Sequence, residues 1–170
     1  MKKLTLLLLF LSLSFVNAQK DKQLYDIIEA ISEDRIEKDV QTLVNFGTRN
    51  TFSDTISDTR GIGAARRWIK SEFDTISKNC NDCLNVFYQK DFVSKEGNNR
   101  VPHDAWVVNV VAIQKGTKYP NRYVIMSGDI DSRASNTMNF TIDAPGANDN
   151  ASGMAGTIEA ARVLSKYEFE

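Results

Sequence analysis

The sequence predicts a layered α/β domain in which helices enclose a sheet. Residues 106–113 and 123–126 are almost entirely apolar and rich in β-branched side chains. Strands with this pattern are buried on both faces, as in sheets that lie between helices. Apolar residues on either side of these strands recur at helical spacing. Buried strands together with amphipathic helices indicate a layered α/β fold.

Four helical segments are expected around these strands. Residues 24–31 and 36–44 carry apolar helical faces that are broken near Ser32. A third face runs over residues 62–76 and ends before the cysteines. Residues 153–165 place their apolar side chains on one face, so a helix is expected to follow the second buried strand.

The connecting segments have their own patterns. Residues 86–93 alternate weakly and predict an edge strand. Residues 95–102 are charged, contain Gly and Asn, and predict a hairpin tip, whereas residues 48–60 are polar and predict a loop. Residues 134–144 are long for a strand-to-helix connection, and such a segment could line a substrate pocket.

Residues 1–18 are predicted to be a signal peptide. Two lysines precede an apolar run over residues 4–16, and a small-x-small pattern follows it. Cleavage is therefore expected between Ala18 and Gln19. The apolar run is shorter than the roughly 20 residues that a membrane-spanning anchor needs. The chain is thus expected to be exported, to a periplasm or the extracellular space, without a membrane anchor.

The composition of the mature chain fits one globular domain. About 150 residues follow the predicted cleavage site, which is enough to form one hydrophobic core. The formal net charge of the whole chain is -1. This balance gives no electrostatic reason to expect nucleic acid or an anionic membrane as a partner.

The two cysteines, Cys80 and Cys83, are expected to form a local disulfide in an oxidising compartment. A redox CxxC centre usually opens a helix after a strand, whereas this pair lies between a helical pattern and a strand pattern. A four-ligand zinc site would need a second pair of ligands of this kind. The disulfide is therefore the favoured interpretation.

Two acidic turns adjoin the second buried strand and the last helix. Asp129 and Asp131 follow the strand expected over residues 123–127, and Asp149 lies at the entry to the helix. Ligands in open α/β sheets gather at the carboxyl ends of strands. Neighbouring carboxylates repel each other unless a cation or a proton lies between them. The turns therefore indicate a metal site, with a helix N-cap role as the alternative for Asp149.

Three basic residues are also candidates for roles at or beside this site. Arg133 could position a substrate, although pairing with Asp131 or Asp129 is the simpler expectation. Arg49 could brace the loop beside the site, and a surface position is an equal alternative. His103 is the only histidine, and its polar loop predicts a solvated side chain rather than a metal ligand.

The turns and their flanks resemble the M28 zinc peptidases. The similarity lies in Gly-Asp-Ile-Asp-Ser-Arg at 128–133, in Ala-Pro-Gly-Ala-Asn-Asp-Asn-Ala-Ser-Gly at 144–153, and in Glu-Ala-Ala-Arg-Val-Leu at 159–164. It extends upstream through residues 46–50 and 61–68. The resemblance therefore covers most of the mature chain.

The resemblance implies a fold and a site. The fold would be a three-layer α/β/α sandwich with a mixed, largely parallel sheet of the phosphorylase/hydrolase-like type, truncated here. Asp149 matches the carboxylate that bridges two zinc ions, and Asp131 matches an acid that orients a metal ligand. Asp129 stands where the family usually has a histidine ligand, a departure that bears on metal occupancy. A Glu-Glu pair, an acidic ligand and a distal His are expected beyond Glu170.

The implied function is that of an exported metallo-aminopeptidase, which hydrolyses N-terminal peptide bonds with metal-activated water. Residues 19–170 would be the N-terminal part of the peptidase domain, inactive when isolated. Two alternatives stay open. One is a glutaminyl-cyclase-like acyltransferase with a single zinc, although residues 148–153 look more like the peptidase version. The other is a degenerate, non-catalytic binding domain, which the unusual Asp129 favours.

Overall fold

The structure is a computed structural model that describes residues 21–170. The predicted signal peptide, residues 1–18, and its cleavage position therefore lie outside the described residues. The chain divides into two compact units, Met1–Ala30 and Ile31–Glu170. Among the described residues, no helix has both the length and the apolar character needed to cross a membrane.

The described part of the first unit is helix α2, Lys22–Glu29. Its start is fixed by Asp21, whose carboxylate accepts hydrogen bonds from the backbone N–H groups of Gln23 and Leu24. An aspartate at this position satisfies donors that have no partner within the helix. The helix confirms the first helical segment predicted from the sequence, with a start and an end two residues earlier.

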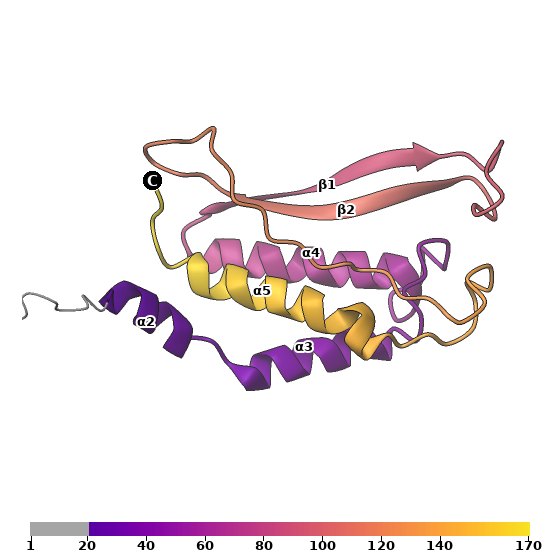
Figure 1. Cartoon of the computed structure of the whole chain (residues 1–170), viewed down its shortest axis with the longest axis horizontal. Helices are drawn as coiled ribbons and strands as arrows, with labels where there is room; N and C mark the ends of the chain where they lie inside the picture. The colour runs from indigo at the N-terminus through magenta and orange to yellow at the C-terminus, as the bar shows by residue number, and fades with distance from the viewer. Residues whose placement is uncertain (1–20) are drawn as a thin grey trace, which may run out of the picture. The chain divides into compact units, whose positions relative to one another are not determined.

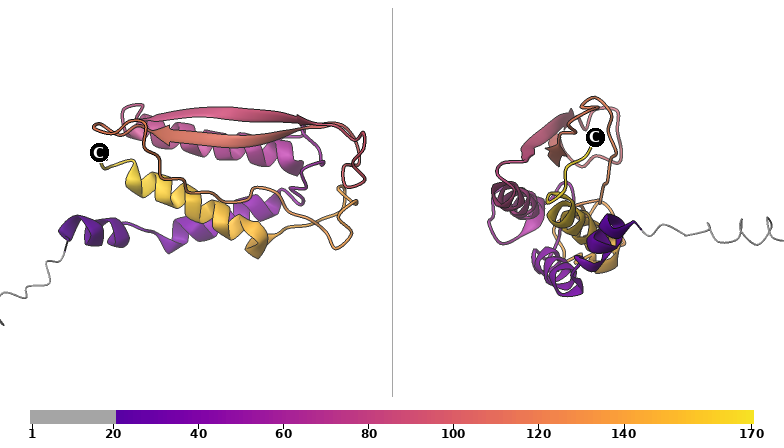
Figure 2. Two further views of the ribbon diagram at one scale, coloured as in Figure 1. Left: turned by 45° about the horizontal axis from the view of Figure 1, so that its top comes forward. Right: turned by 90° about the vertical axis from the view of Figure 1, so that its left-hand side faces the viewer.

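The second unit packs three helices and a β-hairpin in layers (Figures 1 and 2). Strands β1 (Leu84–Val93) and β2 (Ala105–Gln114) form the hairpin and lie along helix α4 (Gly61–Asn79). Helix α5 (Ser152–Leu164) packs against α4 and also against helix α3 (Glu33–Asn45). The middle helix of the unit is therefore the one that begins beside the second acidic turn.

One face of each of these helices supplies the core. The buried apolar residues that pack together are Leu43, Ala65, Ile69, Phe73, Ile76, Ala151, Met154 and Ile158. Side chains from one face of the hairpin pack against them: Leu84, Val86, Val110 and Ala112. The spacing is three or four residues on the helices and two on the strands, as each geometry requires. The helices predicted over 36–44, 62–76 and 153–165 are thus confirmed.

The predicted break near Ser32 is confirmed by a cap. The Ser32 hydroxyl accepts a hydrogen bond from the Arg35 N–H at 3.3 Å. Glu33 and Asp34 occupy the first turn of α3, where negative charge interacts favourably with the helix dipole. The helix therefore starts where local chemistry satisfies its first donors.

A cluster of charges joins α3, α4 and α5. Arg162 on α5 contacts Asp39 on α3 at 2.5 Å and Glu72 on α4 at 2.6 Å. Arg35 on α3 contacts Glu159 on α5 at 2.5 Å. Burial acts to raise the pKa of Glu159, but hydrogen bonds from Arg35 and from a backbone N–H outweigh it and leave the pKa below its ordinary value. Each helix contributes to the cluster, which helps to fix their alignment.

The predicted local disulfide is confirmed. Cys80 and Cys83 are bonded, with their Cα atoms 5.4 Å apart. The two residues between them, Asn81 and Asp82, both have φ of 58°, a conformation that Asn and Asp adopt more readily than most residues. The bond closes the tight turn that leads from α4 into β1.

The sheet is smaller than the sequence predicts. β1 and β2 form a two-stranded antiparallel hairpin, so the edge strand and the hairpin tip are confirmed. The three-layer sandwich with a largely parallel sheet is not confirmed within the described residues. The strand predicted over 123–127 is irregular, and Val124 and Ile125 are 96% and 85% exposed.

The physical reason for this difference is pairing. An apolar strand is buried only when a neighbouring strand and a covering layer are available, and residues 123–127 pair with no strand of the described chain. The helices likewise pack against only one face of the hairpin (Figure 2). Among residues 106–113, only Val108 is therefore buried.

The charge cluster predicts an acid-dependent contribution to stability. Glu159→Gln should lower the free energy of unfolding by about 2 kcal/mol near pH 7, because it removes a buried carboxylate that accepts charge-assisted hydrogen bonds from the half-exposed Arg35. The folded pKa of Glu159 is depressed, so the contribution of its carboxylate is complete above the unfolded pKa of about 4.3 and is lost below it. The difference from wild type should shrink as the pH falls below about 4.

Urea denaturation between pH 3 and pH 7 checks this expectation. Lys118→Gln is the matched control, since Lys118 and Glu170 form an exposed pair at 3.2 Å, and such pairs contribute about 0–1 kcal/mol. A constant difference between Glu159→Gln and wild type across this pH range would contradict the expected role of Glu159.

Candidate metal centre

The two acidic turns of the sequence lie against each other in the structure. The first acidic turn is residues 128–133, and the second is residues 144–150. The second includes most of a short π-helical turn, η2 (Ala147–Ala151), that leads into α5. Gly128 brings the first turn against α5, because a Cβ at this position would lie 2.6 Å from the Met154 backbone nitrogen. Only glycine permits so close an approach.

The loop after α3 connects the two turns. The Ser132 hydroxyl accepts a hydrogen bond from the Arg49 N–H at 2.9 Å and donates one to the Ala144 carbonyl at 2.6 Å. The Ala144 N–H donates to the Gly47 carbonyl at 2.8 Å. Thr48 and Ala144 form an isolated parallel bridge. Segments more than 80 residues apart in the sequence are thus joined through their backbones.

Asp149 keeps its carboxylate outside the helix cap. Sequence alone left Asp149 as either a metal ligand or the N-cap of α5. The N-cap position is Ala151, which has no side-chain capping bond, and the Gly153 N–H donates instead to Asn150 Oδ1 at 2.9 Å. Asp149 is exposed, and its carboxylate has no hydrogen-bond or ion-pair partner among the described residues. Its oxygens are therefore available to a ligand.

Asp131 is the acidic neighbour of two buried arginines. Arg49 is 0% exposed and Arg66, on α4, is 7% exposed; the Nε of Arg66 has no hydrogen-bond partner in the described chain. Burial lowers the pKa of both guanidinium groups, and attraction to Asp131 opposes this effect. Asp131 also accepts a hydrogen bond from the Thr51 hydroxyl at 3.1 Å. The orienting role expected of Asp131 stays a prediction.

Asp129 and Arg133 are exposed on the first acidic turn. Neither side chain forms an ion pair or a hydrogen bond within residues 21–170, so the expected pairing of Arg133 with Asp131 or Asp129 is not seen. The metal-ligand role of Asp129 and the substrate-binding role of Arg133 stay predictions.

The described residues do not form a complete metal site. Within them, no three or more His, Cys, Asp or Glu side chains gather in an arrangement that could hold a metal ion. A zinc site has at least three protein ligands. Carboxylate oxygens bind zinc, so the chemistry of Asp149 and Asp129 fits a divalent cation. Their role as metal ligands stays a prediction.

His103 is a loop residue, as the sequence predicts. Its exposed ring lies between Phe52 and Phe140, with ring centroids 5.6 Å and 5.4 Å away. Its Nδ1 lies 2.9 Å from the Asp104 carbonyl oxygen. The histidine therefore joins three loops through aromatic contacts and a backbone hydrogen bond.

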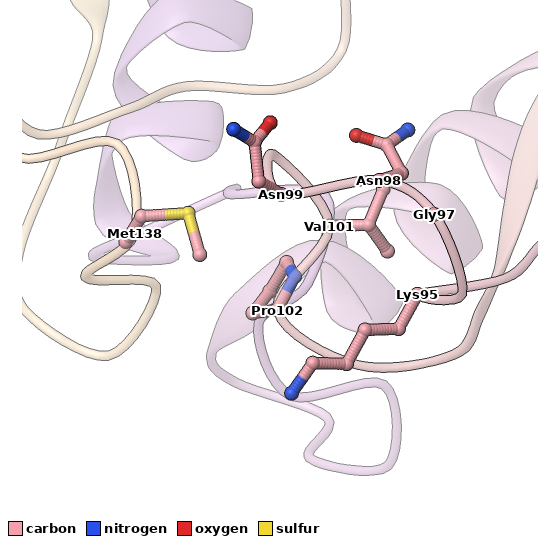
Figure 3. Close-up of a pocket in the computed structure, with 7 residues that line it drawn as sticks. All are labelled: Lys95, Gly97, Asn98, Asn99, Val101, Pro102 and Met138. Atoms are coloured by element: carbon pink, nitrogen blue, oxygen red, sulfur yellow. The ribbon is translucent and has the colours of Figure 1, made fainter.

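A shallow pocket of about 670 Å³ lies between the hairpin tip and the loop of residues 134–144 (Figure 3). Its lining residues are Lys95, Gly97, Asn98, Asn99, Val101, Pro102 and Met138. Figure 3 shows that Met138 faces the tip of the hairpin across the pocket. The long loop before α5 thus lines a pocket, and its use by a substrate stays a prediction.

Sequence reasoning did not single out Ser132 or Arg66. Ser132 is a small polar residue between two charged ones, and nothing in its neighbours marks it as 3% exposed. The sequence did hold a signal for Arg66, since it follows a segment of mostly small residues, 61–65, that is buried at the start of α4. Small side chains at this end of a helix indicate close packing that also covers the next residue.

Comparison with known proteins supports the resemblance. Residues 109–170 match the model of peptidase family M28. A probable zinc metalloprotease of Pyrenophora teres f. teres is 42% identical over 148 residues, which cover 87% of this chain and 30% of that protein. A probable zinc metalloprotease of Pyricularia oryzae is 39% identical over 148 residues, which cover 85% of this chain and 28% of that protein.

A further probable zinc metalloprotease, of Leptosphaeria maculans, is 38% identical over 156 residues, covering 92% of this chain and 36% of that protein. The matched segment carries both acidic turns and α5. Over residues 109–170 the chain is thus similar to peptidase family M28, as its motifs indicate. It spans about a third of the length of the curated relatives that it matches.

The position of Asp131 predicts a stability effect. Asp131→Asn should lower the free energy of unfolding by about 1 kcal/mol, because it removes the negative charge beside the buried guanidinium groups of Arg49 and Arg66. The effect is modest because the Asp131 carboxylate is exposed. Urea denaturation at pH 7 measures the change. Asp129→Asn is the control on the same turn and should change stability by less than about 0.5 kcal/mol. Equal effects of the two variants would contradict the assignment.

Proposed function

We propose that this chain forms one side of the metal centre of an exported aminopeptidase of family M28. The observation that carries the proposal is Asp149. Its carboxylate is exposed, takes no part in capping α5, and lies on a turn that packs beside the first acidic turn. An acidic side chain without a local partner in a family of zinc peptidases supports a metal-ligand role.

In this proposal, Asp149 and Asp129 would supply carboxylate ligands to zinc, with Asp149 as the principal one. Asp131 positions the neighbouring ligand, and its hydrogen bond from Thr51 holds the carboxylate in place. The bound metal supplies Lewis acidity and a water that is acidic near neutral pH. The residues described here contribute ligands and orientation, and none of them is assigned as the general base.

The substrate of the proposal is a peptide with a free N-terminus. The pocket between the hairpin tip and Met138 supports this class, because it combines apolar side chains with the Asn98 and Asn99 amides. Such a mixture can hold a peptide side chain and bond to its backbone. Arg133 would contact a carbonyl or carboxylate of the peptide.

Export is part of the same proposal. It rests on the lysines and the apolar run of residues 1–18. Mass spectrometry of the mature protein should find Gln19 as its first residue. A mature chain that begins at Met1 would contradict export by this route.

A non-catalytic binding domain is the second candidate. It is favoured by Asp129, an acid at a position where the resemblance leads one to expect histidine. Carboxylates are harder ligands than imidazole, so this change alters the metal preference of the site. Metal content and hydrolysis together separate the two candidates, since a binding domain would show no hydrolysis that depends on metal.

The decisive variant is Asp149→Asn in the natural gene product, at whatever length its gene encodes. The wild-type protein should contain zinc and should hydrolyse aminoacyl-p-nitroanilides in a reaction that a chelator abolishes. Asp149→Asn should weaken zinc binding or activity on the order of 100-fold, because an amide oxygen lacks the charge that holds the cation.

The matched control is Asp58→Asn, since Asp58 is 92% exposed and pairs with Arg67 at the surface. Elemental analysis and initial rates should show the control within about twofold of wild type. Wild-type protein that holds no metal and shows no chelator-sensitive hydrolysis would contradict the proposed function.

A further inference from the structure

We propose that Arg49 is a positioning residue that sets the spacing between the two acidic turns, and through it the separation of Asp131 and Asp149. The inference rests on the proposed function for its link to metal. The mechanical part, that one guanidinium group holds both turns, rests on contacts within the chain alone.

Arg49 bonds to backbone carbonyls of both turns at once. Its Nε donates to the Ile130 carbonyl at 3.0 Å in the first turn. Its Nη1 and Nη2 donate to the Pro145 and Gly146 carbonyls, at 2.7 Å and 2.9 Å, in the second turn. A further bond from Nη1 to the Leu43 carbonyl, at 2.8 Å, ties the same group to the end of α3. One planar group therefore spans three segments.

The chemistry of the guanidinium group explains why an arginine occupies this position. Its five donors form a rigid fork, so the directions of several acceptors are fixed relative to one another. A lysine ammonium group is a compact point charge on a flexible stem and cannot span the same carbonyls. Arg49 is 0% exposed, so water does not replace a lost bond.

The backbone of Arg49 forms additional hydrogen bonds to the same region. Its N–H donates to the Ser132 hydroxyl, and its carbonyl accepts from the Ser132 N–H at 3.3 Å. The Ser132 hydroxyl then donates to the Ala144 carbonyl. Gly146 has φ of 50°, and a Cβ there would lie 2.6 Å from the Ser132 Cβ. The two turns are thus in direct contact around Arg49.

The position of the bonded carbonyls gives the inference its link to the metal site. Ile130 immediately precedes Asp131, and Gly146 lies three residues before Asp149. A shift of either backbone moves the corresponding carboxylate. Arg162 provides the contrast: it is also largely buried, but it bonds to the carboxylates of Asp39 and Glu72 on the helices, away from both turns.

The test combines hydrogen exchange with zinc titration on the natural gene product. In the metal-free protein, Arg49→Lys should speed exchange of the Ser132 and Ala144 amides on the order of 10-fold, while core amides of α4 stay unchanged. Ser132→Ala is a second, milder variant that should speed exchange in the same two turns. Zinc affinity should fall about 10–100-fold in Arg49→Lys.

Arg162→Lys is the control for a general loss of stability. It should speed exchange in the helices and leave zinc affinity within about threefold of wild type. Unchanged exchange in both turns of Arg49→Lys, a uniform increase over the whole chain, or equal loss of zinc by Arg162→Lys would each overturn the inference. If wild type binds no zinc, the proposed function fails, and the exchange measurement still decides whether Arg49 sets the turns.

Discussion

A buried guanidinium group without a hydrogen-bonded carboxylate partner is the constraint on which the site depends. Arg49 satisfies its charge with four backbone carbonyls, from α3 and from both acidic turns. Desolvation makes an unpaired buried cation costly, so these carbonyls are held in place as firmly as the arginine itself. The local geometry of the turns therefore follows from where one side chain is buried.

The packing of the helices holds the segments around Arg49 in position. α3 and α5 bring two of the three segments to Arg49, and the charge cluster of Arg162, Asp39, Glu72 and Glu159 aligns these helices with α4. The hairpin contributes one apolar face to the same core. Helix packing and turn geometry are thus parts of one continuous network of contacts. The network holds the backbone of the turn that carries Asp149, and the Asp149 carboxylate itself forms no contact within it.

Local patterns in the sequence predicted local structure well. The helical periodicity of residues 62–76, the break at Ser32, and the Cys80–Cys83 disulfide each depend on neighbours a few residues away, and each is present. The strand expected over 123–127 depends on a partner strand and a covering layer. Its apolar composition shows what environment it favours but does not supply that environment, so its side chains are exposed in this chain.

The site was predictable in part for the same reason. The resemblance pointed to Asp129, Asp131 and Asp149 as candidates, because they lie in short runs of characteristic residues. The sequence indicated that Arg49 could brace the loop beside the site, but not what it contacts, since Arg49 and Ser132 meet only in the fold, 83 positions apart. Whether Asp149 bonds to the first turn of α5 likewise required the geometry of the turn, in which Asn150 and not Asp149 accepts the Gly153 N–H.

Crystals of the natural gene product grown with zinc, with anomalous diffraction at the zinc edge, would test the central claim most directly. A zinc ion should lie about 2.0–2.2 Å from a carboxylate oxygen of Asp149. The Arg49 guanidinium should still bond to the Ile130, Pro145 and Gly146 carbonyls. Zinc bound elsewhere with the Asp149 carboxylate uncoordinated, or an Arg49 side chain released from both turns, would contradict the account.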